Sequence, residues 1–409
     1  MVFFTANAGK MRDLDMKRGL FSIVVGAVAV SVSSASACTS WVLRPEVTES
    51  GRMIIQKILD NPHSPLDADF RVAPNGWRWI RIGRHNGPSM AMNEKGVAIT
   101  ANCGEKNGDE TTRKGRHTFY SFELLWHVVR NCATAEKAVV ELKHIGRNRL
   151  FRMPGGKSPV KYGTILMVAD AKRAFMVEIG DGYCEAVEIT SGIYVVANAW
   201  RLPGCEAVSV HNGQDIRGNR AREVCAVKAL HENQVDGKYT IRGCFETSRR
   251  IRGPKYLQRY PFVPVDPKSK NMSLMSGCFE IDPEFPAYLS CAYTSLGPQR
   301  HTVYLPVPMA VKQLPDKMRD GRWAKMAFAH QDAFGPNHGD MQKFTDLEDK
   351  FLKEFDAARD AARKLLRAGK TDEAVKLLND TFERQYAEAD KLMTALQKAA
   401  AAAKPDTQK

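Results

Sequence analysis

The hydrophobic pattern of this 409-residue chain changes its period near residue 335, and this change constrains the fold more than any other feature. Over residues 38–335 the apolar residues form short runs that are typical of strands, with a few stretches at helical spacing. Over residues 344–396 they recur every three or four positions, with a break at Gly369. The pattern therefore predicts a strand-rich domain at 38–335, followed by a C-terminal helical hairpin and polar tail at 336–409.

Individual segments of the strand-rich part can also be assigned. Asp170-Ala-Lys-Arg173 separates two apolar runs, which predicts a β-hairpin. Apolar runs predict strands at 52–59, 162–169, 174–179 and 193–197, a glycine turn precedes a strand within 91–100, and helical spacing predicts helices at 119–130 and 134–145. Strands flanked by such helices indicate a layered α+β domain.

Residues 1–37 have the composition of a secretory signal peptide. Met16-Lys-Arg18 is basic, the following stretch 20–32 is apolar, and Ala35-Ser-Ala37 is a small-residue cleavage site. The apolar stretch is too short to span a membrane, and no later stretch is longer. We therefore expect an exported protein, periplasmic or extracellular, whose signal peptide is cleaved after Ala37.

Cleavage at this site makes Cys38 the first residue of the mature chain. A thiol and a free α-amino group on one residue form a nucleophile and base pair, because the amine titrates at about 7.7–8.0 and the thiol at about 8.5. Two other uses of Cys38 fit the same cleavage site, a lipid-modified cysteine and one half of a disulfide. A lipoprotein signal normally has a larger aliphatic residue where Ala35 stands.

The remaining cysteines allow disulfides but do not define them. Apart from Cys38 they form an even set, and export permits their oxidation. Eight cysteines allow 105 pairings, so the sequence does not give the connectivity. No C-x-x-C pair and no H-E-x-x-H motif occurs, and we expect neither a metal nor an organic cofactor.

The formal net charge of +14 lies mostly within residues 38–340. Its basic clusters fit either a solvated face or an attraction to acidic substrates or an anionic envelope. Export and the absence of any nucleic-acid motif argue against nucleic acid as a partner. The clusters are Arg78, Arg81 and Arg84; Lys143, Arg147, Arg149 and Arg152; and Arg249, Arg250, Arg252 and Lys255.

Five short motifs, the first of which begins at Cys38, occur in a defined order along the chain. They are Cys38-Thr-Ser-Trp41, Lys57-Ile-Leu-Asp60, Asn93-Glu-Lys-Gly-Val-Ala-Ile-Thr100 leading into Asn102, Ala197-Asn198-Ala-Trp200 and Thr247-Ser-Arg249. In this order the chain resembles the cysteine N-terminal-nucleophile hydrolases over roughly residues 38–310. That superfamily includes choloylglycine hydrolases, the isopenicillin-N acyltransferase group and cysteine dipeptidases. The resemblance implies a four-layer αββα sandwich whose first strand presents the nucleophile, and the helical hairpin looks most like the dipeptidase branch.

The resemblance also implies roles for single residues. Cys38 matches the nucleophile, and Asp60 matches the acid that orients the amine and thiol. Lys57 stands where the family usually has arginine, and lysine lacks the planar fork of a guanidinium. We therefore expect Lys57 to meet substrate differently from the family's arginine.

Three further matches complete the implied site. Asn102 and Asn198 match positions of the oxyanion hole, where amide N–H groups meet developing negative charge. Arg249 matches an arginine of the family's active site, although Arg250 is one residue away and leaves the register open.

The expected function is an exported cysteine amidohydrolase that cleaves a linear amide bond through a thioester on Cys38. The expected substrate is a small amide or short peptide with a carboxylate, such as a bile-salt-like conjugate, a dipeptide, a peptidoglycan fragment or another N-acyl amino acid. The sequence leaves a homo-oligomer open. An acyltransferase would use the same thioester, and a non-catalytic lipoprotein or binding module on this fold is the alternative from another class.

Overall fold

The computed structural model describes residues 38–62, 66–84, 87–107, 121–148, 150, 161–180, 182–206, 213–250, 271–335 and 341–403. The predicted signal peptide lies outside these residues. By their contacts, the described residues all belong to one compact unit.

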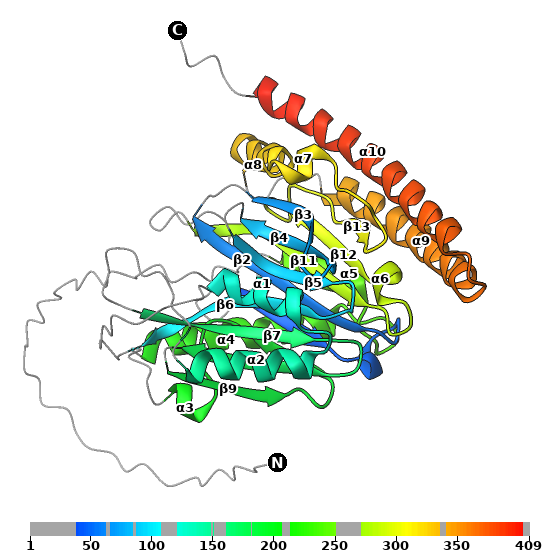
Figure 1. The fold of residues 1–409 in the computed structure, drawn as a ribbon. Coiled ribbons are helices and arrows are strands. Elements are labelled where there is room, and N and C mark those ends of the chain that lie inside the picture. Colours follow the sequence, from blue (N-terminus) through cyan, green and yellow to red (C-terminus); the bar gives the residue numbers. More distant parts are fainter. Residues whose placement is uncertain are drawn as a thin grey trace, which may run out of the picture. The chain divides into compact units, whose positions relative to one another are not determined.

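Two antiparallel sheets form the centre of this unit (Figure 1). The six-stranded sheet has the order β10-β1-β2-β11-β12-β13, and the seven-stranded sheet runs consecutively from β3 to β9. The first is built from β1 (Thr39–Leu43), β2 (Met53–Pro62), β10 (Ile193–Val196), β11 (Asn271–Ile281), β12 (Cys291–Leu296) and β13 (Leu305–Pro308). The second is built from β3 (Leu66–Val72), β4 (Arg78–Arg84), β5 (Gly87–Asn93), β6 (Ala98–Asn107), β7 (Lys161–Ala169), β8 (Ala174–Gly180) and β9 (Tyr183–Glu188).

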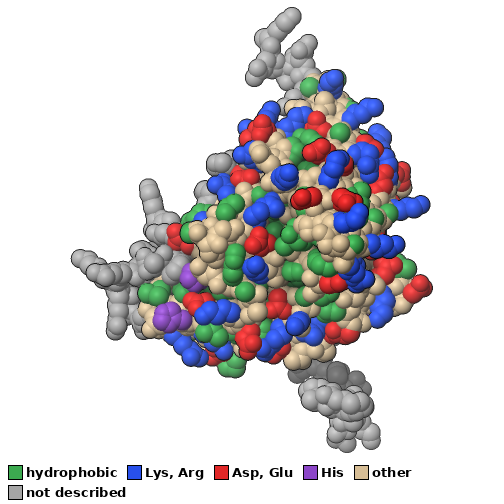
Figure 2. All heavy atoms as spheres, turned by 45° about the vertical axis from the view of Figure 1, so that its right-hand side comes forward, with side chains coloured by type: hydrophobic (Ala, Val, Ile, Leu, Met, Phe, Trp, Pro, Cys, Tyr) green, Lys and Arg blue, Asp and Glu red, His purple; other side chains and the backbone are tan. Residues whose placement is uncertain are grey.

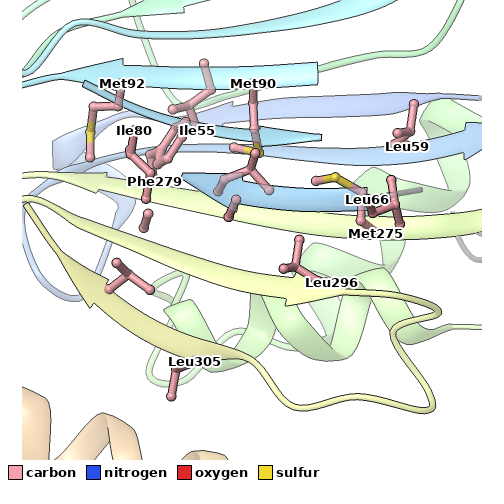
Figure 3. Packing of buried hydrophobic residues seen from close by; sticks show 14 of the residues in the cluster. Ile55, Leu59, Leu66, Ile80, Met90, Met92, Met275, Phe279, Leu296 and Leu305 are labelled. Carbon is pink, nitrogen blue, oxygen red and sulfur yellow. The ribbon is translucent and has the colours of Figure 1, made fainter. Parts of the chain in front are cut away.

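The sheets pack face to face through a shared apolar cluster. Ile55 and Phe279 come from the six-stranded sheet, and Ile80 and Met92 come from the seven-stranded sheet. Figure 3 shows these side chains converging between the strands. Alternating side chains let each strand fill this cluster with one face and a second cluster with the other.

Helices cover both outer faces of the sheets. Helices α1 (Ser121–Asn131) and α2 (Ala135–Arg147) close the apolar cluster on the outer side of the seven-stranded sheet. Helices α4 (Gly213–Glu232), α5 (Ile241–Arg249) and α9 (Met341–Arg367) contribute to the cluster on the outer side of the six-stranded sheet. The four-layer αββα arrangement that the resemblance implies is therefore confirmed.

The C-terminal helical hairpin is also confirmed. Helices α9 and α10 (Thr371–Ala403) are joined at Gly369, whose φ of 73° lies in the left-handed region that glycine tolerates. Both pack on β13, and α10 packs on α8 (Arg322–Phe334). On the face seen in Figure 2, basic and acidic side chains are interspersed, and the hairpin carries such pairs, including Lys350 with Glu388.

Most of the individually predicted segments are present. The strand expected at 52–59 is β2, the expected β-hairpin is β7 and β8, and the two predicted helices are α1 and α2. Asp170 stabilises the hairpin turn, because its carboxylate accepts the backbone N–H groups of Lys172 and Arg173. The remaining short helices are a 3-10 turn (Pro45–Val47), α3 (Pro203–Glu206), α6 (Pro286–Leu289) and α7 (Asp316–Arg319).

The nine cysteines lie among the described residues, and the structure shows no disulfide between them. The disulfides allowed by the sequence are therefore not present in this structure. Eight of the nine are buried, and several pack within the apolar clusters on the outer faces of the sheets, as small apolar side chains do. Among the described residues, no helix is both long and apolar enough to cross a membrane.

Candidate active site

The alternation of side chains along β2 directs a lysine into the space between the sheets. Ile55 and Leu59 belong to the apolar cluster between the sheets, whereas Ile54 and Ile58 belong to the cluster on the outer face. Lys57 has the parity of Ile55 and Leu59, so it faces the interior. Buried strand positions of this kind normally carry apolar residues, and a lysine is rarely found there unless a neighbouring group pairs with it.

The strand register brings residues from three strands to one end of the six-stranded sheet. Ser40 on β1 pairs with Lys57 on β2 and with Val196 on β10. Extending the second of these antiparallel registers by two residues places Asn198 opposite Cys38. Cys38, Lys57 and Asn198 are therefore neighbours in the fold although they are far apart in the sequence.

Cys38 lies directly before β1 and is held through both its thiol and its backbone. Its side chain is hydrogen-bonded to the side chain of Lys57. Its Sγ also lies 3.9 Å from the backbone carbonyl oxygen of Asp60, to which it donates a weak hydrogen bond. The carbonyl oxygen of Cys38 itself accepts a hydrogen bond from Nη1 of Arg222 at 2.8 Å. The position of the sulfur is thus fixed from several sides.

Lys57 is fixed across the interface between the two sheets by Asn102 on β6. Lys57 Nζ donates to Asn102 Oδ1 at 2.5 Å, and the hydroxyl of Ser40 donates to the same oxygen at 2.8 Å. All three side chains are fully or almost fully buried. Lys57 was expected to meet substrate, and in this structure its buried amine contacts the Cys38 side chain and the Asn102 amide.

The amide nitrogen of Asn102 is also occupied. Its Nδ2 donates to the carbonyl oxygens of Val196 at 3.3 Å and of Ala197 at 2.8 Å. In this arrangement its two N–H groups are directed at the backbone of β10 and the residue after it, and not at a substrate. The side chain predicted to stabilise an oxyanion therefore joins the two sheets and positions Lys57.

Asn198 keeps a donor available. Its Nδ2 donates to the carbonyl oxygen of Cys103 at 2.6 Å, and its Oδ1 accepts from Nη1 of Arg222 at 3.2 Å. An amide nitrogen has two N–H groups, and this bond uses one of them. Since Asn198 lies opposite Cys38 in the strand register, its second N–H is a candidate donor beside this residue.

Arg222 is a further residue of the site and was not predicted from the sequence. This residue lies on α4, where its guanidinium contacts the carbonyl oxygen of Cys38 and the side chains of Asn198 and Asn219. The adjacent Glu223 accepts the backbone N–H of Ala197 at 2.9 Å and so fixes the chain just before Asn198. Nothing in the spacing of α4 distinguishes these two residues from its other charged side chains.

Asp60 ends the polar part of β2 beside a β-bulge in β11. Ser273 pairs with Asp60 just before the register shifts, and its hydroxyl donates to Asp60 Oδ1 at 2.5 Å. Burial raises the pKa of Asp60 to about 7, although the Ser273 hydrogen bond and the charges of Arg222 and Lys57 act in the opposite direction. This carboxyl group can therefore gain or lose a proton near neutral pH.

The amine of Lys57 has a pKa below its ordinary value. Burial lowers the pKa of its amine, while the neighbouring Cys38, Asp60 and Cys103 act to raise it. Burial likewise raises the pKa of Cys103 to about 12, so this second thiol near the site stays protonated. The site therefore holds a thiol, an amine and a carboxyl group, all of them buried.

Arg249 lies in a different environment from Cys38. It is at the end of α5, where its Nη1 and Nη2 donate to the carboxylate of Glu348 on α9 at 2.7 and 2.5 Å. Its remaining hydrogen bonds reach the carbonyl oxygens of Gln299 and Thr302. Arg250, the alternative in register, pairs with Glu232. These contacts place Arg249 in an anchor for the C-terminal hairpin, and Arg222 is the arginine in contact with Cys38.

Several residues of the basic clusters have partners of their own. Arg81 forms an ion pair with Asp67 at 2.7 Å, and Arg78 donates to the carbonyl oxygens of Met309 and Val311. The described part of the chain holds no group of three or more His, Cys, Asp and Glu side chains arranged to bind a metal ion. The chemistry available at the site is that of a thiol, its neighbouring amine and carboxyl groups, and amide donors.

Comparisons with known proteins give matches only among solved structures. No protein-family model and no curated protein matches the chain. Two structures of variants of the conjugated bile acid hydrolase from Clostridium perfringens are similar with TM-scores of 0.44, 12% identity, and coverage of 66% of this chain and 92% of theirs. Penicillin V acylase from Agrobacterium tumefaciens has a TM-score of 0.36 and 13% identity over 66% of this chain and 86% of its own.

Proposed function

We propose that this protein is an exported cysteine amidohydrolase that cleaves linear amide bonds through a thioester on Cys38. The observation that carries the proposal is the hydrogen-bonded group around the residue expected to begin the mature chain. The thiol of Cys38 contacts the amine of Lys57 and the backbone carbonyl oxygen of Asp60, and the backbone carbonyl oxygen of Cys38 contacts Arg222. A buried cysteine with a merely structural role would have no need of a buried lysine beside its thiol.

The proposed reaction begins when the α-amino group of Cys38 takes the thiol proton and becomes an ammonium, while Sγ attacks the amide carbonyl carbon. Negative charge then develops on the carbonyl oxygen, where the free N–H of Asn198 can donate a hydrogen bond. The α-ammonium group of Cys38 protonates the leaving amine, and a thioester remains. Water then hydrolyses the thioester and releases the acid.

Fixing the backbone of Cys38 supports this use of the α-amino group. Arg222 holds the carbonyl oxygen of Cys38, and strand β1 holds the next residues. Because the amine and the carbonyl group share one Cα, a fixed carbonyl also restricts where the amine lies. A base restricted in this way loses little entropy when it transfers a proton.

For the substrate we propose a small amide or short peptide that carries a carboxylate. The excess of basic residues supports a negatively charged substrate, although Arg81 and Arg249 are already paired within the fold. Bile-salt-like conjugates, dipeptides, peptidoglycan fragments and other N-acyl amino acids all meet this description.

Two mass measurements on the secreted protein test the proposal. The first is the intact mass, which should correspond to a chain that begins at an unmodified Cys38. The second follows quenching during turnover of a panel of N-acyl amino acids and dipeptides, and it should show the added acyl mass on the peptide containing Cys38. A lipid mass on Cys38, or turnover that persists in Cys38→Ala, would overturn the proposal. A new amide product on adding amines would identify the acyltransferase instead.

A further inference from the structure

Lys57 is the least expected residue of the site, because an ammonium group is expensive to bury. The whole side chain is inaccessible to solvent, at 0% exposure. Its amine nevertheless lies beside the one thiol that the proposed reaction must deprotonate. A lysine that served only as a positive charge could be replaced by arginine, whose charge is permanent and easier to hold in buried ion pairs.

The hydrogen bonds around Lys57 Nζ suit an uncharged amine. A neutral amine has two N–H groups and one lone pair. One N–H is donated to Asn102 Oδ1 at 2.5 Å, and this oxygen also accepts from Ser40. The contact with the Cys38 side chain then allows the thiol to turn its one proton from the weak bond with the Asp60 carbonyl oxygen to this lone pair. Asn102 thus fixes the amine in the orientation that a proton acceptor needs.

The charged groups around Lys57 also favour transfer of the Cys38 thiol proton to its amine. The side chains facing it are Cys38 before β1, Asp60 on β2 and Cys103 on β6, and Arg222 on α4 acts on Asp60. Burial lowers the pKa of Lys57, whereas formation of a thiolate at Cys38 raises it. The amine therefore becomes a better base as the thiol becomes an anion.

We propose that Lys57 is the catalytic base that accepts the thiol proton of Cys38, so that the site uses two amines, Lys57 and the α-amino group. The inference rests on the proposed function and assigns the two proton transfers of its first step to different groups.

The proposed cycle balances. Before reaction Lys57 is a neutral amine, Cys38 is a thiol and the α-amino group is an ammonium. The thiol proton moves to Lys57, Sγ bonds to the carbonyl carbon, and the α-ammonium gives its proton to the departing amine as the C–N bond breaks. Water then attacks the thioester and gives a proton to the α-amine, while the departing sulfur recovers its proton from Lys57. Every group returns to its starting state.

Alkylation of Cys38 by iodoacetamide tests the assignment without any substrate. Its rate follows the thiolate fraction, and peptide mass spectrometry separates Cys38 from the eight other cysteines. The rate is measured against pH for the wild type, Lys57→Met, Lys57→Arg and the exposed control Lys172→Met. We expect Lys57→Met to raise the midpoint for Cys38 by at least about one pH unit, which makes alkylation about tenfold slower at pH 7. The control should match the wild type.

Lys57→Arg separates a base from a simple cation. A guanidinium stabilises the thiolate but cannot accept a proton, so alkylation of Cys38 should stay fast while turnover falls by about 10²-fold. Equal turnover with an unchanged pH profile would overturn the proposal, since a fixed charge would then suffice. An unfolding curve for each variant identifies a folding defect, and the arginine variant still provides the test if Lys57→Met does not fold.

A form that keeps Ala37 separates the two amines, because the α-amino group is then an amide nitrogen without basicity. We expect Cys38 in this form to keep a low alkylation midpoint as long as Lys57 is present. A midpoint as high as that of Lys57→Met would overturn the proposal and assign the thiol proton to the α-amine. Failure of the proposed function would look different, with no panel substrate cleaved and the alkylation profiles unaffected.

Discussion

Two buried groups of charged side chains lie on opposite faces of the six-stranded sheet, and they differ in how their charges are balanced. On the outer side, the carboxylate of Glu348 accepts four hydrogen bonds, two from Arg249 and one each from Arg242 and the backbone of Tyr304. The group around Cys38, between the sheets, is not matched in this way. Its members are Lys57 and Asp60. Burial lowers the pKa of the lysine and raises the pKa of the aspartate, and both shifts favour the uncharged side chain.

The comparison teaches how to distinguish a structural charge cluster from a reactive one. An arginine paired with a saturated carboxylate has no proton to exchange near neutral pH, so its position is its only contribution. A lysine beside a thiol and a carboxyl with a pKa of about 7 can change its charge at little cost. The sequence resemblance assigned Arg249 to the site, whereas the balance of charges assigns it to the support of the fold.

The largest expected effect is on turnover, from a substitution of Cys38. Cys38→Ala should lower turnover by on the order of 10⁴-fold or more, because no other group can form the thioester. Stability should fall by only about 1 kcal/mol, since the substitution removes a single buried sulfur atom. Steady-state kinetics with an unfolding curve checks both, and Cys38→Ser should keep at most a trace of activity. Normal turnover in the alanine variant would place the reaction elsewhere.

The second largest effect is expected at Glu348, where a substitution should lower stability and leave turnover unchanged. Glu348→Gln should lower the free energy of unfolding by about 3–5 kcal/mol, because Arg249 loses its buried counter-charge. The molecules that remain folded should keep their turnover. The matched control is Glu388→Gln on the same hairpin, whose partly exposed pair with Lys350 should contribute about 0–1 kcal/mol. Urea denaturation measures both, and equal losses would remove the distinction between the two pairs.

The pH dependence of stability is the third effect and concerns Asp60. Burial raises its folded pKa to about 7 from the ordinary 3.8, so the folded state prefers the protonated carboxyl. Its contribution is complete below pH 4 and is lost as the pH rises towards 7, at up to about 1.4 kcal/mol for each pH unit. Relative to Asp60→Asn, the wild type should therefore lose stability between pH 4 and pH 7. A constant difference across this range would contradict the shift.

The smallest expected effect concerns the cysteines. Thiol titration of the denatured, unreduced protein should find nine thiols, and reducing agent should not change the unfolding curve. A disulfide would instead contribute about 2–4 kcal/mol that the reductant removes. A single titratable thiol would show that the protein forms four bridges absent from this structure.

The sequence was sufficient for the layered fold and for part of the site. Apolar runs identified β2 and the β7–β8 hairpin because these strands are buried on both faces, and the 3.6-residue period identified the C-terminal helices because each buries one face. The order of short motifs brought Cys38, Lys57, Asp60, Asn102 and Asn198 into one hypothesis, and the structure places all five together.

The rest of the site depends on tertiary packing that local patterns do not encode. Arg222 meets Cys38 only because α4 lies against the end of β1 and β10, and Ser273 meets Asp60 only through the register of β11 before its bulge. The role of Asn102 was predicted from its position in the motif, but its hydrogen bonds are set by the carbonyl groups of the opposite sheet. The sequence shows that Arg249 is charged, but it does not show that its partner is Glu348, which lies 99 residues further along the chain.

The late position of Glu348 in the chain has a consequence for biogenesis. Arg249 and Arg242 emerge from the ribosome well before the carboxylate that neutralises them. Until α9 is available, closing the outer layer would bury Arg249 without its counter-charge, whereas Arg242 still pairs with Glu246 on its own helix, and the nearly complete polypeptide should therefore stay open. Premature termination before residue 348 should leave a product that proteases remove, so that only full-length molecules persist.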